Sequence, residues 1–294
     1  MISKQILDIA IPFVTLAMML VVGLDLSPAD FDRVRRQPGT VAAGLIGPLL
    51  LLPPIALGLI ALLKPAPPTQ AGLLLIASCP VGGISNTYNY LARASTALSV
   101  TLTAISCLLT VVTMPILTRV FELVLGRPFG FRVPVPALMG QLLLLLALPV
   151  GAGMFIRRHS PAFAARHGRG FRRLAFGSIA LLIGFVVLSQ WREFVSHLAS
   201  MMLLAAAMVG ASLLAGLLVG TVIGSDRRDR FTLAVEFATR NVAIASVISI
   251  TLLGQVQFAV FAATYFVTEA PIVLAAVLVF RRGSRLEPES PTPV

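Results

Sequence analysis

Helix-breaking and polar residues interrupt one of the apolar stretches of this sequence. Residues 71–94 read AGLLLIASCPVGGISNTYNYLARA, with Pro80, Gly82 and Gly83 in the middle of the run. Proline removes a backbone amide donor, and glycine lowers the cost of unwinding a helix. Unwound backbone in a membrane frees carbonyl groups for cations and helix N-termini for anions. An ordinary kink is the alternative, but four polar residues follow directly: Ser85, Asn86, Thr87 and Asn89.

A second apolar stretch carries charged residues near its centre. Residues 229–253 read DRFTLAVEFATRNVAIASVISITLL, and the central polar residues are Glu236, Thr239, Arg240 and Asn241. A charged residue at the middle of a membrane helix costs ~2.5–3.5 kcal/mol on insertion scales, so such residues usually face a cavity or one another. Glu236 and Arg240 are separated by one helical turn and would share a helix face. A purely structural ion pair is therefore the alternative here.

The composition indicates that membrane-spanning helices position these residues. Of the 294 residues, 57% are hydrophobic and 12% are charged, against about 25% charged in soluble domains. A hydrocarbon core about 30 Å thick is crossed by about 20 apolar residues of helix. We predict an all-α polytopic membrane protein that forms a single transmembrane unit without a soluble domain. Its nine predicted spans are residues 5–25, 38–63, 70–92, 95–121, 134–156, 172–190, 197–224, 230–253 and 256–280.

The basic residues lie in short loops between the spans. The formal net charge of +11 could suggest a nucleic-acid partner, but no basic face or tail is present to bind one. Alternating spans divide the basic residues unequally: the larger group is Arg33, Arg35, Arg36, Arg93, Arg157, Arg158, Arg166, Arg169, Arg172, Arg173, Arg227, Arg228, Arg230, Arg281, Arg282 and Arg285. The smaller group is Lys4, Lys64, Arg119, Arg127, Arg132 and Arg192. The positive-inside rule then predicts an outer N-terminus and a cytoplasmic C-terminus.

The two interrupted spans hold matching positions if the chain contains an inverted repeat. Spans 1–4 and 6–9 can be paired, with the fifth span as an unpaired lead-in, and the third member of each repeat is then the interrupted one. Paired interruptions of this kind are the best sequence indication of the midplane site of a secondary transporter. We therefore predict a secondary transporter with two broken, crossing helices.

Three segments of the sequence resemble the bile acid:sodium symporter family. They are CPVGGISNTYNYLARASTALSVTLTAIS at residues 79–106, VEFATRN at 235–241 and MMLVVGLDLSPADFDRVRRQP at 18–38. The similarity extends in order over about residues 10–280, and the chain resembles the nine-span form of the family. The resemblance implies a core domain made of spans 2, 3, 4, 7, 8 and 9, and a panel domain made of spans 1, 5 and 6. It also implies alternating access by movement of one domain against the other.

The resemblance further implies where ions and substrate bind. One sodium ion of the family is held by groups that match Ser85, Asn86, Ser99, Thr103 and Glu236. A second family site shares the glutamate and uses two glutamines, which match Arg240 and Pro48 here, so the second sodium site is expected to be absent. The expected substrate-binding residues are Gly83, Asn86, Thr87, Thr239, Arg240, Asn241 and Glu269. Family members carry varied organic anions, so we expect a carboxylate or sulfonate rather than a bile acid in particular.

Other functions remain as alternatives at this point. A sodium-independent or proton-coupled carrier or exchanger of the same fold follows if Arg240 simply neutralises Glu236. Glu269 could be a partner of Arg240, a proton site or an interfacial residue. An intramembrane enzyme is disfavoured because His159, His167 and His197 lie at span ends or in loops, away from a nucleophile. The expected setting is the inner (plasma) membrane, with a small organic anion, sodium and the lipid bilayer as partners, no nucleic acid, and a monomer as the working state.

Overall fold

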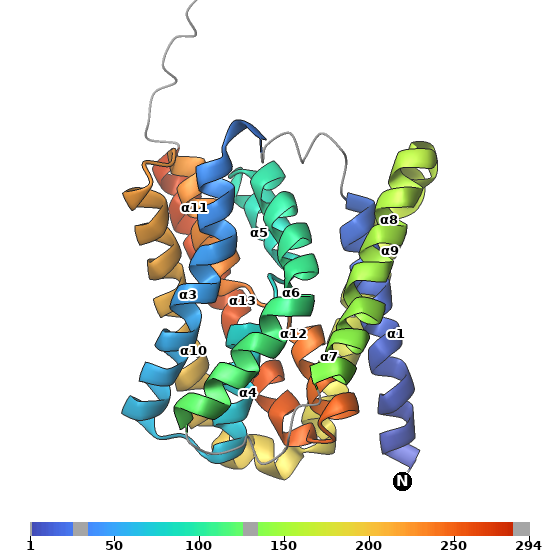
Figure 1. Cartoon of the computed structure of the whole chain (residues 1–294), viewed down its shortest axis with the longest axis vertical. Helices are drawn as coiled ribbons and strands as arrows, with labels where there is room; N and C mark the ends of the chain where they lie inside the picture. Colours follow the sequence, from blue (N-terminus) through green and yellow to red (C-terminus); the bar gives the residue numbers. More distant parts are fainter. Residues whose placement is uncertain (1, 26–34, 126–134, 285–294) are drawn as a thin grey trace, which may run out of the picture.

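The computed structural model describes residues 2–25, 35–125 and 135–284, and this part of the chain is built from helices (Figure 1). The first part of the chain contains α1 (Ile2–Asp25), α3 (Pro38–Leu63), the pair α4 (Pro67–Ser78) and α5 (Ile84–Ala92), and α6 (Thr96–Leu125). Next come α7 (Val135–Leu142), the π-helix η1 (Leu143–Ala147), α8 (Leu148–His159) and α9 (Pro161–Ser189). The last are α10 (Trp191–Val222), α11 (Arg227–Ala238), α12 (Val242–Val247), the π-helix η2 (Ile248–Leu252) and α13 (Val256–Ser284).

Five helical segments of the described residues are long and apolar enough to cross a membrane. They are Pro38–Leu63, Thr96–Val124, Val135–His159, Phe194–Val222 and Val256–Arg282. Backbone groups in lipid must be satisfied within the segment that spans it, and a continuous helix does so. The predicted all-α polytopic membrane class is confirmed.

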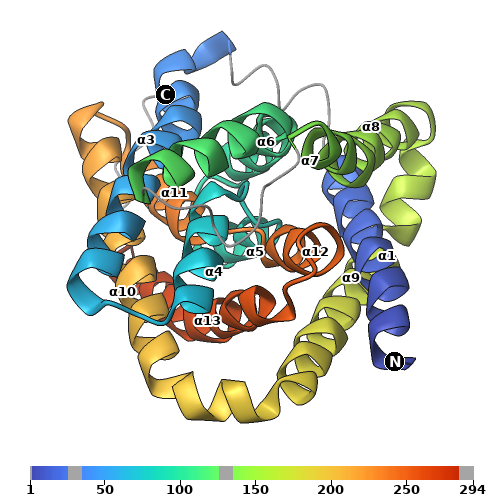
Figure 2. The same ribbon diagram turned by 60° about the horizontal axis from the view of Figure 1, so that its bottom comes forward.

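The helices form two groups. One group contains α1, the continuous α7–η1–α8 and α9, and it lies to one side of the remaining helices in both views (Figures 1 and 2). We call this group the panel and the remaining helices the core. Within the panel, α1 and α8 approach so closely that a Cβ atom on Gly23 would lie 2.2 Å from the Val150 carbonyl oxygen. Small residues at such contacts let membrane helices pack backbone against backbone.

Two broken helices meet in the core. The segment α4–α5 is unwound between Ser78 and Ile84, and the segment α11–α12 is unwound between Ala238 and Val242. Val81 and Arg240 form an antiparallel bridge there, so each break satisfies backbone groups of the other. The Gly82 amide donates to the Thr239 carbonyl at 3.0 Å, and the Asn241 amide donates to the Pro80 carbonyl at 2.9 Å.

Glycine is required where the two broken helices cross. A Cβ atom on Gly82 would lie 2.7 Å from the Arg240 carbonyl oxygen, which is closer than a real Cβ contact allows. The neighbouring proline, Pro80, has no amide to leave unsatisfied, and its carbonyl is used in the bridge. The sequence Cys-Pro-Val-Gly-Gly at residues 79–83 therefore suits a crossing of two backbones better than a kink in one helix.

The helix ends that carry the larger group of basic residues lie on one side of the molecule. In Figure 1 the starts of α3 and α11 and the end of α13 share the upper end, and the Arg227 side chain donates to the Phe280 carbonyl at 3.3 Å. Arg33, Arg127, Arg132 and Arg285 lie outside the described residues. The outer N-terminus and cytoplasmic C-terminus stay predictions.

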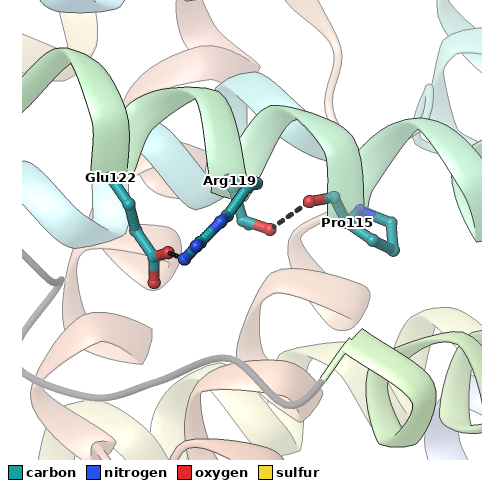
Figure 3. A network of polar contacts seen from close by, with 4 residues as sticks. Pro115, Arg119 and Glu122 are labelled. Atoms are coloured by element: carbon teal, nitrogen blue, oxygen red, sulfur yellow. Dashed lines mark hydrogen bonds and ion pairs between the residues drawn. The ribbon is translucent and has the colours of Figure 1, made fainter.

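An ion pair lies near the C-terminal end of α6. Arg119 and Glu122 are one turn apart, with Nη1 and Oε2 at 2.6 Å (Figure 3). The Arg119 side chain is 69% exposed and the Glu122 side chain 11% exposed, and pairs with an exposed partner typically contribute between about 0 and 1 kcal/mol. Glu122 therefore provides a peripheral carboxylate against which the buried ones can be compared.

Candidate functional site

Glu236 lies at the centre of a buried polar cluster in the core. Its side chain belongs to α11 and is fully buried. Ser99 Oγ donates to Glu236 Oε1 at 2.5 Å, and Asn89 Nδ2 donates to the same oxygen at 3.1 Å. Thr103 Oγ1 donates to Oε2 at 3.4 Å. Hydrogen bonds to a carboxylate are stronger than neutral ones, so this environment can hold an ionised Glu236.

Hydroxyl and amide groups from two other helices complete the cluster. Ser99 Oγ also lies 2.7 Å from Asn86 Oδ1, and Ser85 Oγ lies 3.3 Å from Thr103 Oγ1. Ser99 and Thr103 are one turn apart on α6, so one helix face presents both hydroxyls. Ser85 and Asn86 begin α5 directly after the crossing. All five side chains that sequence similarity matched to a sodium site therefore lie together, from α5, α6 and α11.

Asn89 also belongs to this cluster, although sequence similarity did not match it to a sodium ligand. Its amide Nδ2 lies within 3.1 Å of both Glu236 Oε1 and Ser99 Oγ, and it donates to the Ser85 carbonyl at 3.0 Å. The available signal was its position: Asn89 follows Ser85 by one helical turn and so shares its helix face.

The cluster has the chemistry that a small hard cation requires. Its side-chain oxygens come from two serines, a threonine, an asparagine and one carboxylate, and oxygen ligands of this kind suit hard metal ions. Asn89 Oδ1 is buried and accepts no hydrogen bond from the described residues. Since buried polar atoms are normally satisfied, this oxygen has capacity for a further partner, and the oxygen groups of the cluster fit sodium.

Arg240 lies at the crossing and does not pair with Glu236. The helix α11 ends at Ala238, so Arg240 no longer follows the helical spacing that would have placed it over Glu236. Its Nη2 atom donates to the Cys79 carbonyl, whereas Nε and Nη1 have no partner among the described residues. The side chain is 4% exposed. The structural ion pair considered from the sequence is absent from the described part of the chain.

Arg240 and Pro48 line the same small cavity. The cavity has a volume of ≈ 20 Å³, and its walls come from α3, α6 and the crossing. This is room for about one water molecule. The two positions that sequence similarity matched to the glutamines of a second sodium site are therefore neighbours. Neither a guanidinium nor a proline side chain can coordinate a cation.

Three of the predicted substrate residues line a second cavity, between the core and α1. Gly83, Arg240 and Asn241 surround ≈ 10 Å³ of space together with Met18 of the panel. Asn241 has two local roles: its Oδ1 accepts from the Ile244 amide at 3.2 Å and caps α12, and its Nδ2 lies 3.8 Å from Met19 Sδ. The guanidinium of Arg240 and the start of α5 therefore border the same small space between core and panel.

The other predicted substrate residues lie elsewhere. Asn86 is part of the carboxylate cluster, and Thr87 is exposed on the far side of α5. Thr239 and Glu269 are fully buried and do not line either cavity at the crossing.

Comparisons with known proteins agree with this architecture. A model of the sodium bile acid symporter family matches residues 12–198. The chain belongs to this family. Its members are transporters and not enzymes, and the matched residues include Ser85, Asn86, Ser99 and Thr103 of the cluster. Glu236 and Arg240 lie beyond the matched range, so their place in the site rests on the geometry.

Individual relatives of this symporter family are similar over varying lengths. The chain is 28% identical to a probable chloroplastic sodium/metabolite cotransporter, BASS1, of Arabidopsis thaliana over 90% of this chain and 65% of that protein. It is 32% identical to a rice relative, BASS2, described in the same way, over 51% of this chain and 34% of that protein. It is 27% identical to an uncharacterized sodium-dependent transporter, YocS, of Bacillus subtilis, over 79% of this chain and 70% of that protein. The chain thus spans about one third to two thirds of the length of the two plant relatives.

Proposed function

We propose that this family member is a secondary transporter that carries a small organic anion together with one sodium ion. The observation that supports it most directly is the oxygen cluster around Glu236, which joins α5, α6 and α11 at the crossing. Sodium would be held by Ser85, Asn86, Ser99, Thr103 and Glu236. Its positive charge would compensate the buried carboxylate, which is costly to leave unpaired in a membrane.

The proposed stoichiometry of one sodium ion follows from Arg240. In the place of a second ion site the chain has a permanent cation and a proline, which share a cavity. Glu236 contributes one negative charge, whereas sodium and Arg240 contribute one positive charge each. One positive charge therefore remains at the crossing, and it suits a monoanionic carboxylate or sulfonate. The unpartnered Nε and Nη1 atoms of Arg240 could bind such a group in a bidentate manner.

A sodium-independent or proton-coupled carrier is the second candidate. It would require Arg240 to neutralise Glu236, so that no attraction for sodium remained. The hydrogen bonds favour the first candidate, because both carboxylate oxygens are used by α5 and α6 residues and the guanidinium is directed at Cys79.

Transport by this chain would proceed by movement of the core against the panel. The interface between them is bridged by a hydrogen bond of 2.5 Å from Gln141 Nε2 on α7 to Thr251 Oγ1 on η2. These residues line an open cavity of ≈ 530 Å³, whose walls come from both groups of helices. That volume is in the range of small-molecule sites. Both helices contain a π-helical segment there, which is common where helices have to adjust.

The proposed setting is a cell membrane, with the N-terminus outside and the C-terminus in the cytoplasm. The nine spans, with the panel made of the first, fifth and sixth and the core made of the rest, belong to the same proposal. The basic helix ends on one side of the molecule support this orientation.

Counterflow in proteoliposomes tests the proposal. Vesicles preloaded with a mixture of unlabelled small carboxylates and sulfonates should accumulate labelled members of the mixture when sodium is present, and much less when potassium replaces it. The variant Gln141→Cys/Thr251→Cys, joined by a short bismaleimide cross-linker, should lose at least about tenfold in rate because core and panel are tethered. Each single-cysteine variant, treated in the same way, is the control. Equal rates with and without sodium would contradict sodium coupling, and full activity after cross-linking would contradict the movement.

A further inference from the structure

Glu269 is a second fully buried carboxyl group, and its surroundings differ from those of Glu236. It lies near the middle of α13 with 0% of its surface exposed. Neither Oε1 nor Oε2 has a hydrogen-bond partner among the described residues. Glu236 receives hydrogen bonds on both oxygens. The surroundings of Glu236 thus offer hydrogen bonds that stabilise a negative charge, and those of Glu269 do not.

The side chains around Glu269 are polar, and two of them also lack a hydrogen-bond partner among the described residues. The Thr239 side chain lies beside the carboxyl, and Tyr88 of α5 is close enough to interact with it electrostatically. Thr239 Oγ1 lies beside the carboxyl but outside hydrogen-bond geometry, and the Tyr88 hydroxyl is also buried without a hydrogen-bond partner among the described residues. Tyr265, one turn earlier on α13, donates from its hydroxyl to the Ala238 carbonyl at 2.6 Å. Tyr265 and Glu269 share one face of α13, so this bond holds that face toward the end of α11.

No basic residue of the described part of the chain pairs with Glu269. Of the helices packed against α13, α4, α12 and η2 contain no titratable side chain. The titratable residues of α9 and α10 lie in the N-terminal halves of these long helices, and Arg227, Arg228, Asp229 and Arg230 lie in the first turn of α11. Tyr88 is the titratable group of α5 within electrostatic range of the carboxyl. Glu236 is bound within its own cluster, and Arg240 is directed at Cys79. The alternative that Glu269 pairs with Arg240 is therefore not realised among the described residues.

A proton is the occupant that this environment fits. An isolated carboxylate in a membrane interior is strongly unfavourable, and such a group becomes neutral instead. A metal ion would need several oxygen ligands and room for its radius, but Glu269 lines none of the cavities at the crossing. A proton needs one carboxyl oxygen and no cavity.

We propose that Glu269 is a second ion site of this carrier and that its ligand is a proton. The site deepens the proposed function, because the carrier would then respond to a proton as well as to sodium. One short helix contributes to both surroundings: Ser85 and Asn89 of α5 contact the Glu236 cluster, and Tyr88 of the same helix lies within electrostatic range of Glu269. Movement of α5 during transport would change both environments together, and it would open the Glu269 proton to exchange with solvent.

Infrared spectroscopy of the purified protein tests the proton site without any substrate. In saturating sodium, which keeps Glu236 ionised, the wild-type protein should show a carbonyl band from one buried protonated carboxyl group. This band should be absent in Glu269→Gln and retained in Glu236→Gln. After transfer to D₂O without sodium, where the carrier can move, the band should shift to its deuterated position within the time of a transport cycle.

The outcomes separate this proposal from the proposed function. Sodium-dependent thermal stabilisation should be the same in Glu269→Gln as in the wild-type protein. A wild-type protein without this stabilisation would contradict the sodium site at Glu236, whereas the infrared band tests the proton site separately. If Glu269→Gln folds poorly, Glu269→Asp should keep a protonated band at a changed frequency. A wild-type protein without the band, a band that survives Glu269→Gln, or a band that never shifts in D₂O would overturn the proposal.

Discussion

Replacement of Glu236 by glutamine is expected to abolish the response of the folded protein to sodium. The cluster would keep its hydroxyl and amide oxygens but lose the only negative charge among the proposed ligands. Removal of one partner from a buried charge pair typically costs about 3–5 kcal/mol, which corresponds to a loss of sodium affinity of roughly 100-fold or more. Sodium-dependent thermal stabilisation of the purified variant measures this loss, since a ligand at about 100 times its Kd adds about 2.7 kcal/mol of stability.

The matched control for this substitution is Glu122→Gln. It makes the same chemical change at a carboxylate that lies near the far end of α6 and pairs only with Arg119 in the described part of the chain. Glu122→Gln should keep the full sodium response. If Glu236→Gln binds sodium as well as the wild-type protein does, the cluster is not the sodium site.

Replacement of Arg240 by glutamine is expected to weaken anion binding about tenfold or more while the response to one sodium ion persists. The guanidinium lines both cavities at the crossing but does not contact the Glu236 cluster. Two unit charges at 4 Å interact by about 4 kcal/mol at an effective dielectric constant of 20, so even a partial loss of this attraction is measurable. Anion-dependent thermal stabilisation and counterflow, each with and without sodium, give the two affinities separately.

Arg240→Lys is the matched control, because it keeps the positive charge and a donor for the Cys79 carbonyl but removes the planar fork. It should retain more anion affinity than the glutamine variant does. Tighter sodium binding in Arg240→Gln than in the wild-type protein would mean that Arg240 normally neutralises Glu236. That result would contradict its role as a built-in cation.

The interrupted helices could be predicted from the sequence because they contain residue types that are rare in regular membrane helices. Pro80, Gly82 and Gly83 do not belong in a regular membrane helix, and neither does the Glu236–Arg240 pair. The breaks lie at those residues, between Ser78 and Ile84 and between Ala238 and Val242. The bounds of α3, Pro38–Leu63, also coincide with the predicted span. These features depend on local composition, which a single sequence contains.

Features that depend on the contact between segments could not be predicted. The π-helical segment Leu143–Ala147 lies in a run of apolar residues that carries no local signal. The helical spacing of Glu236 and Arg240 indicated a possible ion pair, but α11 ends between them because the crossing takes over the backbone hydrogen bonds. Asn89 and Thr87 are both polar residues of α5, and only the packing of α6 and α11 distinguishes the buried one from the exposed one.

The most direct test of one-sodium coupling is the dependence of anion counterflow by the wild-type protein on sodium concentration. One sodium ion bound at the Glu236 cluster, with Arg240 in the place of a second, predicts a saturable dependence with a Hill slope of about 1. A slope of about 2 would mean that a second sodium ion binds in spite of Arg240 and Pro48. A rate that does not change with sodium would mean that the cluster does not couple this ion to transport.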